Sequence, residues 1–417
     1  MNIQIIFLSL LCFINTYIKF DLKIEEETSS QSYIENIIKN QIRIIMLIGT
    51  PIQKIPVYIK FDEKISYISG TKISNHLYDE KKSNTYKKDE EEKSYYGQTP
   101  FNLGIPSSDI FKFETKNKKN KEINLKFILA TQESKSKEIN TGVLGLKIDT
   151  FNYEKNGYFL YQLKSNGISD SYGWTIKLND NNKEGEIILG EYPHEYDSRN
   201  YHEKYYKSTR CGKDGVDLNW NIVFDKFTFD NQIYENEVQG TLNIEFGVIV
   251  GITSFRNEID EKFFKNYIDK EKCFYQRTQI NNYYYYTCDT NVDIDEFPSI
   301  KFYNKDFGSD FELNYKDLFV KKNDKYYFLI VFESQNVFKW TLGRPFMKKF
   351  QMVFDHDRRL IGIYLGKEGF INWTIVAIFV LGLVIIGLLY YIINYFKNRP
   401  KRIKANELLE DLEYLTK

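Results

Sequence analysis

Apolar and polar positions alternate in short runs along most of the chain. Between residues 40 and 365, segments rich in Ile, Val, Tyr and Phe end at Gly, Asn or Lys, as in IPVYIKF, WTIKL and YYFLIVF. Such runs are typical of β-strands. Helical periodicity is clear only at Tyr158–Asn166 and Glu258–Tyr267, and the charged stretch Asp79–Lys93 favours a solvated loop. The pattern therefore predicts an all-β region with short helices.

Two longer apolar runs lie near the ends of the chain. Ile3–Ile14 is shorter than the roughly 20 apolar residues that span a bilayer, and it favours a secretory signal peptide over residues 1–20, with a buried first strand as the alternative. Ile371–Phe396 has no charged residue and predicts a transmembrane helix over 371–396. Five Lys and Arg residues follow it within 397–417, so the positive-inside rule makes this tail cytoplasmic. We expect a single-pass type I protein whose preceding region is lumenal or extracellular.

A weak internal repeat divides the region between these runs. Asp62 ends an apolar strand and is followed by Gly145 in TGVLGL, and Glu245 ends another and is followed by Gly343 in KWTLGRPF. Each half thus contains an acidic residue at the end of a strand, followed later by two apolar residues and a Gly. The repeat predicts a duplicated lobe.

Charge and chemistry exclude several functions. The chain has 57 Lys and Arg residues against 57 Asp and Glu residues, so it lacks the basic excess that nucleic acid binding requires. Its four His residues are scattered, with no HExxH motif, no Cys pairs at metal spacing, no G-x-S-x-G elbow and no glycine-rich phosphate loop. The sequence therefore predicts no metal and no cofactor.

The cysteines fit an oxidising compartment. Cys12 falls in the signal peptide, and Cys273 and Cys288 are 15 residues apart, so they could close a local loop around the tyrosines of the YYYY run. Cys211 is left either as a thiol or as a bridge between chains.

Several segments, in order, resemble the pepsin-like aspartic peptidases over roughly 42–365. The most specific is KWTLGRPFMKKFQMVFDHDRRLIGIYL (339–365), and LIGTPIQKIPVYIKFD (47–62), SYYGQTPFNLG and TGVLGL also match family segments. The resemblance implies a bilobal all-β fold with lobes at 21–192 and 193–367 and a peptide-binding cleft between them. It also implies that Tyr96 and Gly97 belong to a flap and that Cys273 and Cys288 form a disulfide loop.

The departures from the family pattern bear on activity. The family uses two Asp-Thr/Ser-Gly motifs, in which the paired carboxylates share a proton, the Gly N–H donates to a carboxylate and the hydroxyl locks the two loops together. The resemblance assigns Asp62 (Asp-Glu-Lys) and Glu245 (Glu-Phe-Gly) as a degraded pair. The extra methylene of Glu245 displaces its carboxylate by about 1.5 Å, and a shift of that order can lower a rate about 10²-fold. Arg344 replaces the Asp that follows Leu-Gly in the family, as a rim cation or as an anchor for a carboxylate.

The sequence leaves a leading function, one alternative and a third class of function. The first is a membrane-anchored, pepsin-like protein with little or no turnover that binds peptides or partners in the cleft. The alternative is an active acid endopeptidase that uses Asp62 and Glu245. A cell-surface interaction protein unrelated to peptides is the third.

Overall fold

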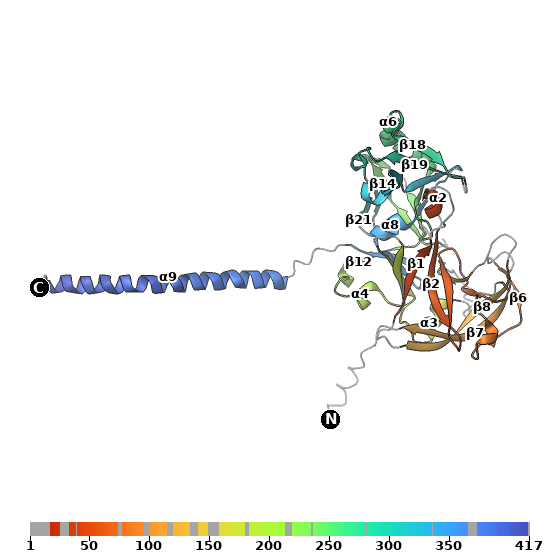
Figure 1. Ribbon diagram of the computed structural model, residues 1–417, viewed down its shortest axis with the longest axis horizontal. Coiled ribbons are helices and arrows are strands. Elements are labelled where there is room, and N and C mark those ends of the chain that lie inside the picture. Colours follow the sequence, from red (N-terminus) through yellow and green to blue (C-terminus); the bar gives the residue numbers. More distant parts are fainter. Residues whose placement is uncertain are drawn as a thin grey trace, which may run out of the picture. The chain divides into compact units, whose positions relative to one another are not determined.

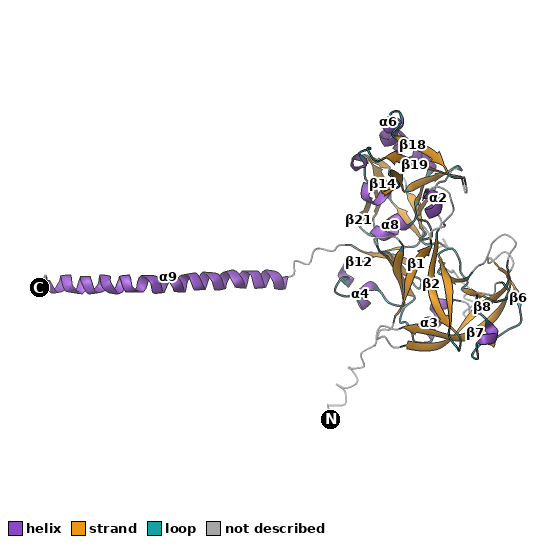
Figure 2. Cartoon of the chain, in the orientation of Figure 1, coloured by secondary structure: helices purple, strands orange, loops and turns teal. Residues whose placement is uncertain are grey.

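The computed structural model describes residues 17–25, 33–38, 40–73, 77–95, 101–114, 120–133, 141–148, 158–179, 183–212, 219–234, 237–279, 282–335, 337–365 and 373–415 (Figures 1 and 2). The chain forms two compact units, Met1–Leu365 and Gly366–Lys417. The first unit is dominated by strands and the second contains one long helix (Figure 2). The all-β prediction is confirmed.

The largest sheet has 14 strands and includes elements from both ends of the first unit. Strands β12, β26 and β27, from the C-terminal part, join it where β10 pairs with β26. The two halves of the unit therefore share one sheet. Its strands are β1 (Ile18–Glu25), β2 (Gln41–Ile48), β3 (Gln53–Lys60), β4 (Tyr67–Ser69), β5 (Lys87–Lys88), β6 (Lys93–Ser94), β7 (Phe101–Glu114), β8 (Asn120–Glu133), β9 (Gly142–Gly145), β10 (Gly173–Leu178), β11 (Glu184–Leu189), β12 (Tyr206–Arg210), β26 (Val353–Asp355) and β27 (Leu360–Tyr364).

Two further sheets build the C-terminal half. The nine-stranded sheet contains β13 (Asn221–Phe224), β16 (Val238–Leu242), β17 (Ile249–Gly251), β18 (Cys273–Arg277), β19 (Tyr283–Asp289), β22 (Phe319–Lys322), β23 (Lys325–Phe328), β24 (Ile330–Glu333) and β25 (Trp340–Leu342). The four-stranded sheet contains β14 (Lys226–Phe229), β15 (Gln232–Tyr234), β20 (Ile300–Asn304) and β21 (Ser309–Leu313).

The helices of the first unit are short. They are α2 (Tyr33–Ile38), α3 (Phe159–Ser165), α4 (Pro193–Tyr196), α5 (Thr253–Ile259), α6 (Lys265–Ile268), α7 (Tyr315–Leu318) and α8 (Arg344–Lys349), with a π-helical turn at Asp260–Phe264 and 3₁₀ turns at Glu80–Lys82, Glu203–Tyr205 and Ile294–Glu296. Helix α3 confirms the prediction at Tyr158–Asn166. It ends at Ser165 with Asn166 as its C-cap, and Gly167 follows with a φ of +65° that a side chain would disfavour. Helices α5 and α6 with the π turn cover the second predicted helix.

Aromatic residues pack the halves of the first unit together. Trp174 stacks on Phe354, with ring centroids 4.0 Å apart, and meets Trp220 edge-on at 5.6 Å. The Trp220 Nε1–H donates to the Leu146 carbonyl at 2.7 Å, so the buried indole has its hydrogen bond. This shared core fixes the loops of both halves relative to each other.

Helix α9 (Trp373–Leu415) forms the second unit. Its stretch Val380–Lys397 is long and apolar enough to cross a membrane, and none of it is buried against the rest of the protein. Residues 371 and 372 of the predicted span lie outside the described residues, and the helix continues through the predicted tail to Leu415. The orientation of this helix across a membrane stays a prediction.

The predicted signal peptide overlaps the first strand. Residues 1–16 lie outside the described part of the chain, but Ile18 and Phe20 belong to β1 and pair with Leu189 and Ile187 of β11. A cleavage that leaves β1 whole has to precede Ile18. The boundary at residues 192 and 193 between two lobes stays a prediction.

Candidate active-site region

In the N-terminal half, the site is framed by a parallel strand pair. Strand β3 runs beside β9, and Lys60 at the end of β3 lies opposite Gly145. Phe61 and Asp62 follow the strand, and Asp62 is solvent-exposed. The first acidic residue predicted from the sequence therefore lies two residues beyond the point where the strands meet.

The C-terminal half repeats this arrangement. Strand β16 runs parallel to β25, and Leu242 lies opposite Leu342. The next residue, Asn243, follows the pair in line with Gly343. Glu245, the second predicted acid, again lies two residues beyond it.

A second strand pairing in each half supports the same equivalence independently of the parallel pairs. Strand β4 pairs antiparallel with β9 at Tyr67, and β17 pairs antiparallel with β25 at Val250. Counted back from each of these residues, the seventh is Lys60 in one half and Asn243 in the other. Lys60 and Asn243 therefore hold matching positions in the two halves.

Local hydrogen bonds identify what these positions correspond to. The Glu245 N–H donates to Asn243 Oδ1 at 3.0 Å. In Asp-Thr-Gly, the Gly N–H donates to the Asp carboxylate two residues earlier, and the bond between Glu245 and Asn243 has the same spacing. Lys60 holds the position in the first half that matches Asn243, just as Asp62 matches Glu245. The two triplets are then Lys60-Phe61-Asp62 and Asn243-Ile244-Glu245.

An ion pair joins the two halves at this site. Lys60 Nζ contacts Glu245 Oε2, and the two side chains are 31% and 11% exposed. The pair is partly shielded from water, which strengthens the attraction between its charges. Asp62 stays in solvent, whereas Glu245 faces an ammonium group.

The middle residues of both triplets are apolar and buried. Phe61 packs edge-on against Trp174 and Phe354, with ring centroids 5.1 and 5.5 Å away, and Ile244 is fully buried. Neither side chain carries a hydroxyl, so neither can form the hydrogen bonds that lock the two loops together in family members.

The segment at α2 and Asn40 binds directly to the second triplet's loop. The Asn40 N–H donates to the Glu245 carbonyl at 3.0 Å, and the Gly247 N–H donates to the Ile37 carbonyl at 2.9 Å. The buried Ile34, Ile37 and Ile38 of α2 form a separate apolar cluster with β17, β19 and β24. The N-terminal segment thus covers the strands that follow the loop.

Arg344 is buried beside this loop. Its side chain donates from Nη2 to Asn40 Oδ1 at 2.7 Å, and its N–H donates to the Phe246 carbonyl at 2.7 Å. Arg344 is 6% exposed, so the expectation of a rim cation is wrong. The preceding Gly343 allows this close approach, because a Cβ there would lie 2.1 Å from the Val248 carbonyl oxygen.

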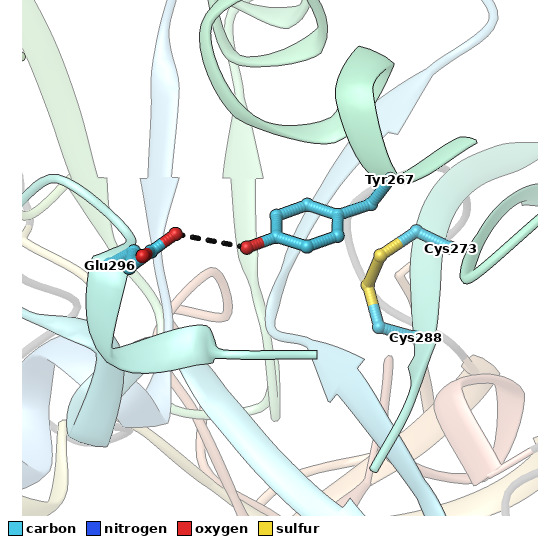
Figure 3. Close-up of a disulfide and its surroundings, with 4 residues drawn as sticks. All are labelled: Tyr267, Cys273, Cys288 and Glu296. Carbon is cyan, nitrogen blue, oxygen red and sulfur yellow. Dashed lines mark hydrogen bonds between the residues drawn. A yellow bond between two sulfur atoms is a disulfide. The ribbon is translucent and has the colours of Figure 1, made fainter. Parts of the chain in front are cut away.

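The remaining predicted residues have separate outcomes. Tyr96 and Gly97 of the predicted flap lie outside the described residues. The Cys273–Cys288 disulfide is confirmed, and Figure 3 shows it near Tyr267, whose hydroxyl donates to Glu296 at 3.0 Å. Cys211 is buried, with its thiol directed at the Asn219 carbonyl, which disfavours a bridge between chains.

Sequence reasoning did not single out Lys60 and Asn243. The signal was present as spacing, because each lies seven residues before the residue that pairs with the Gly-containing segment, Tyr67 or Val250. The assignment of Asp62 and Glu245, two residues later, as a catalytic pair stays a prediction. Within the described ranges, no group of three His, Cys, Asp or Glu side chains could hold a metal ion.

The sequence was compared with known proteins. The sequence model of the eukaryotic aspartyl protease family matches residues 48–364. No curated protein matches the chain.

Proposed function

Since the chain belongs to the eukaryotic aspartyl protease family, we propose that it is a membrane-anchored member without an effective catalytic pair. It binds peptides or partner segments between its two halves with little or no turnover. The observation that carries this proposal is the ion pair of Lys60 with Glu245, beside Asn243.

The family reaction needs two carboxyl groups that share one proton. One carboxylate activates water as a base, and the pair then protonates the leaving amine. In this proposal Lys60 and Asn243 occupy the places of the two catalytic Asp residues, and Lys60 is an ammonium while Asn243 is an amide that does not ionise. Neither group can serve as the carboxylate base.

The nearby acids do not replace the missing pair in this proposal. Glu245 acts as the counter-ion of Lys60, which occupies one of its oxygens. Asp62 is exposed to solvent, whereas Glu245 is largely buried and paired with Lys60. The peptidase alternative requires these two residues to work together.

A cleavage assay decides between the two functions. The full chain is incubated with an unstructured protein between pH 3 and 7, with and without a statine-type inhibitor. We expect background cleavage at every pH, equal in wild type and in the Asp62→Asn, Glu245→Gln double variant. Inhibitor-sensitive cleavage with an acid optimum, lost in the double variant, would establish the peptidase instead.

Binding without turnover is tested separately. Fluorescent random octapeptides are added to the full chain, and anisotropy reports the bound fraction. We expect saturable binding with the peptides recovered intact. If no peptide binds a well-folded protein, the peptide-binding part of the proposal fails and an interaction unrelated to peptides becomes the better explanation.

The proposed topology places the first unit in the lumen or outside the cell. The basic residues that follow the apolar part of α9 support it. A tag after Lys417 should be digested by protease added to the cytoplasmic side of sealed vesicles, while the first unit stays intact. The reverse protection would contradict it.

A further inference from the structure

A pocket of about 610 Å³ lies beside the loop that ends at Gly247. Its walls come from α2, α7, β22 and α8, and Lys183, directly before β11, also lines it. Its volume falls within the roughly 300–1,000 Å³ range of small-molecule sites. The pocket is separate from the Lys60–Glu245 pair, neither member of which lines it.

The pocket is strongly cationic. Among the described residues, the carboxylate that lines it is that of Asp317, and this group is already engaged by Lys349 Nζ at 2.5 Å and by the Asn314 N–H at 2.9 Å. The cationic residues that line it are Lys183, Lys316, Lys322, Arg344, Lys348 and Lys349. Their mutual repulsion disfavours an empty pocket and favours a multiply charged anion.

Arg344 is the most buried of these cations. Its guanidinium is held by Asn40 Oδ1 at 2.7 Å and also directed at the Ile37 carbonyl at 3.5 Å. A guanidinium fixed in this way is preorganised to bind a phosphate or carboxylate group. The exposed Lys316 and Lys322 add two further positive charges to the lining.

Part of the wall is apolar. Tyr33 and Ile37 of α2 line it together with Phe319 of β22. Bare inorganic ions gain nothing from such a surface, whereas an organic anion can bury its carbon skeleton there. The pocket thus combines a cationic end with an apolar wall.

We propose that this pocket binds a small organic phosphate that carries at least two negative charges. Several cations around a compact volume match the charge density of phosphate groups better than the spread charges of an acidic peptide. The same chemistry is offered by a free phosphorylated metabolite and by the phosphate head group of an acidic lipid. The two sources are separated by experiment.

The test uses the full chain in a neutral detergent and titrates it with pyrophosphate by calorimetry at constant ionic strength. We expect saturable binding and a rise in the thermal unfolding midpoint. The Lys316→Gln, Lys322→Gln variant should bind about 100-fold more weakly, at about tenfold for each lost charge-assisted contact. Both lysines are exposed and their removal reduces repulsion in the empty pocket, so without ligand this variant should unfold at the same temperature as wild type or higher.

The matched control removes two exposed lysines elsewhere. The Lys87→Gln, Lys207→Gln variant has the same change in net charge, and neither residue lines the pocket. Its affinity for pyrophosphate should stay within about twofold of wild type. Equal weakening in both variants, or no saturable binding by wild type, would overturn the proposal.

Dihexanoyl phosphatidic acid, a water-soluble lipid phosphate, identifies the source of the ligand. If it binds and pyrophosphate displaces it, the pocket accepts a lipid head group. If pyrophosphate binds and the lipid does not, the ligand is a free phosphate compound. Either result supports the phosphate site, while binding of the lipid that is unaffected by pyrophosphate and by the lysine variant contradicts it.

Discussion

The ion pair between Lys60 and Glu245 makes the strongest quantitative prediction. Removing either charge alone leaves the other partly buried without its partner, whereas removing both leaves none. We therefore expect the Lys60→Met and Glu245→Gln substitutions to be non-additive in the free energy of unfolding. A double-mutant cycle measures this coupling directly.

The size of the coupling follows from distance and exposure. Two unit charges 4 Å apart attract by about 4 kcal/mol at the effective dielectric constant near a protein surface and by about 1 kcal/mol in water. Glu245 is 11% exposed but Lys60 is 31% exposed, so solvent screens part of the attraction. We expect a coupling of about 2 kcal/mol.

Urea unfolding of the first unit, followed by tryptophan fluorescence, provides the assay. Trp174, Trp220 and Trp340 are fully buried, so their emission should shift strongly on unfolding. The pair Lys301–Glu312 serves as a control cycle, since its atoms are 3.4 Å apart and its side chains are 41% and 47% exposed. Its coupling should be at most about 0.5 kcal/mol.

The refuting result is specific. If the Lys60–Glu245 coupling is no larger than that of the control pair, Lys60 does not hold Glu245 in solution. The main support for a lost catalytic pair would then be gone. If the coupling is large but the protein also cleaves a substrate at acid pH, the ion pair forms without preventing catalysis.

Three further predictions test other parts of the structure. Tyr192→Phe removes the hydroxyl that donates to the buried Asp355 carboxylate, and it should lower the free energy of unfolding by about 1–3 kcal/mol in urea titrations. Replacing Cys273 and Cys288 by Ser together opens a 15-residue loop and should lower it by about 3 kcal/mol, whereas reductant should no longer affect the variant. Burial, with the Asp355 charge, raises the pKa of Tyr206 to about 12, so this hydroxyl ionises at lower pH in the unfolded chain than in the folded protein. The stability that comes from the neutral, buried hydroxyl is therefore complete below pH 10 and is lost as the pH rises towards 12. Tyr206→Phe should make the fall in the free energy of unfolding with pH shallower by up to about 1.4 kcal/mol per pH unit.

The sequence allowed the fold to be predicted because the relevant signals are local. Apolar runs broken by Gly and Asn marked the strands, and the periodic segment that became α3 stood out against them. The disulfide was also predictable, since its cysteines are close in sequence and pair across β18 and β19.

The matching positions Lys60 and Asn243 were harder to predict because they depend on register between distant segments. Lys60 is defined by its position opposite Gly145, and Asn243 by a donor two residues later and by the strand beside Gly343. Local pattern shows where a strand ends only within a few residues. A carboxylate near the end of each strand was therefore a stronger signal in the sequence than the register.

The substitutions around the site make physical sense as a set. An ammonium at Lys60 needs an anion, and Glu245 supplies one from the other half of the first unit. Phe61 and Ile244 between them are buried apolar groups, and the proposed function needs no hydroxyl there to hold two carboxylates. Asn243 accepts the N–H bond that shapes the second loop, so an uncharged amide is enough for this backbone geometry. The ion pair, the buried apolar residues and the amide are thus mutually consistent, which supports the proposed loss of turnover.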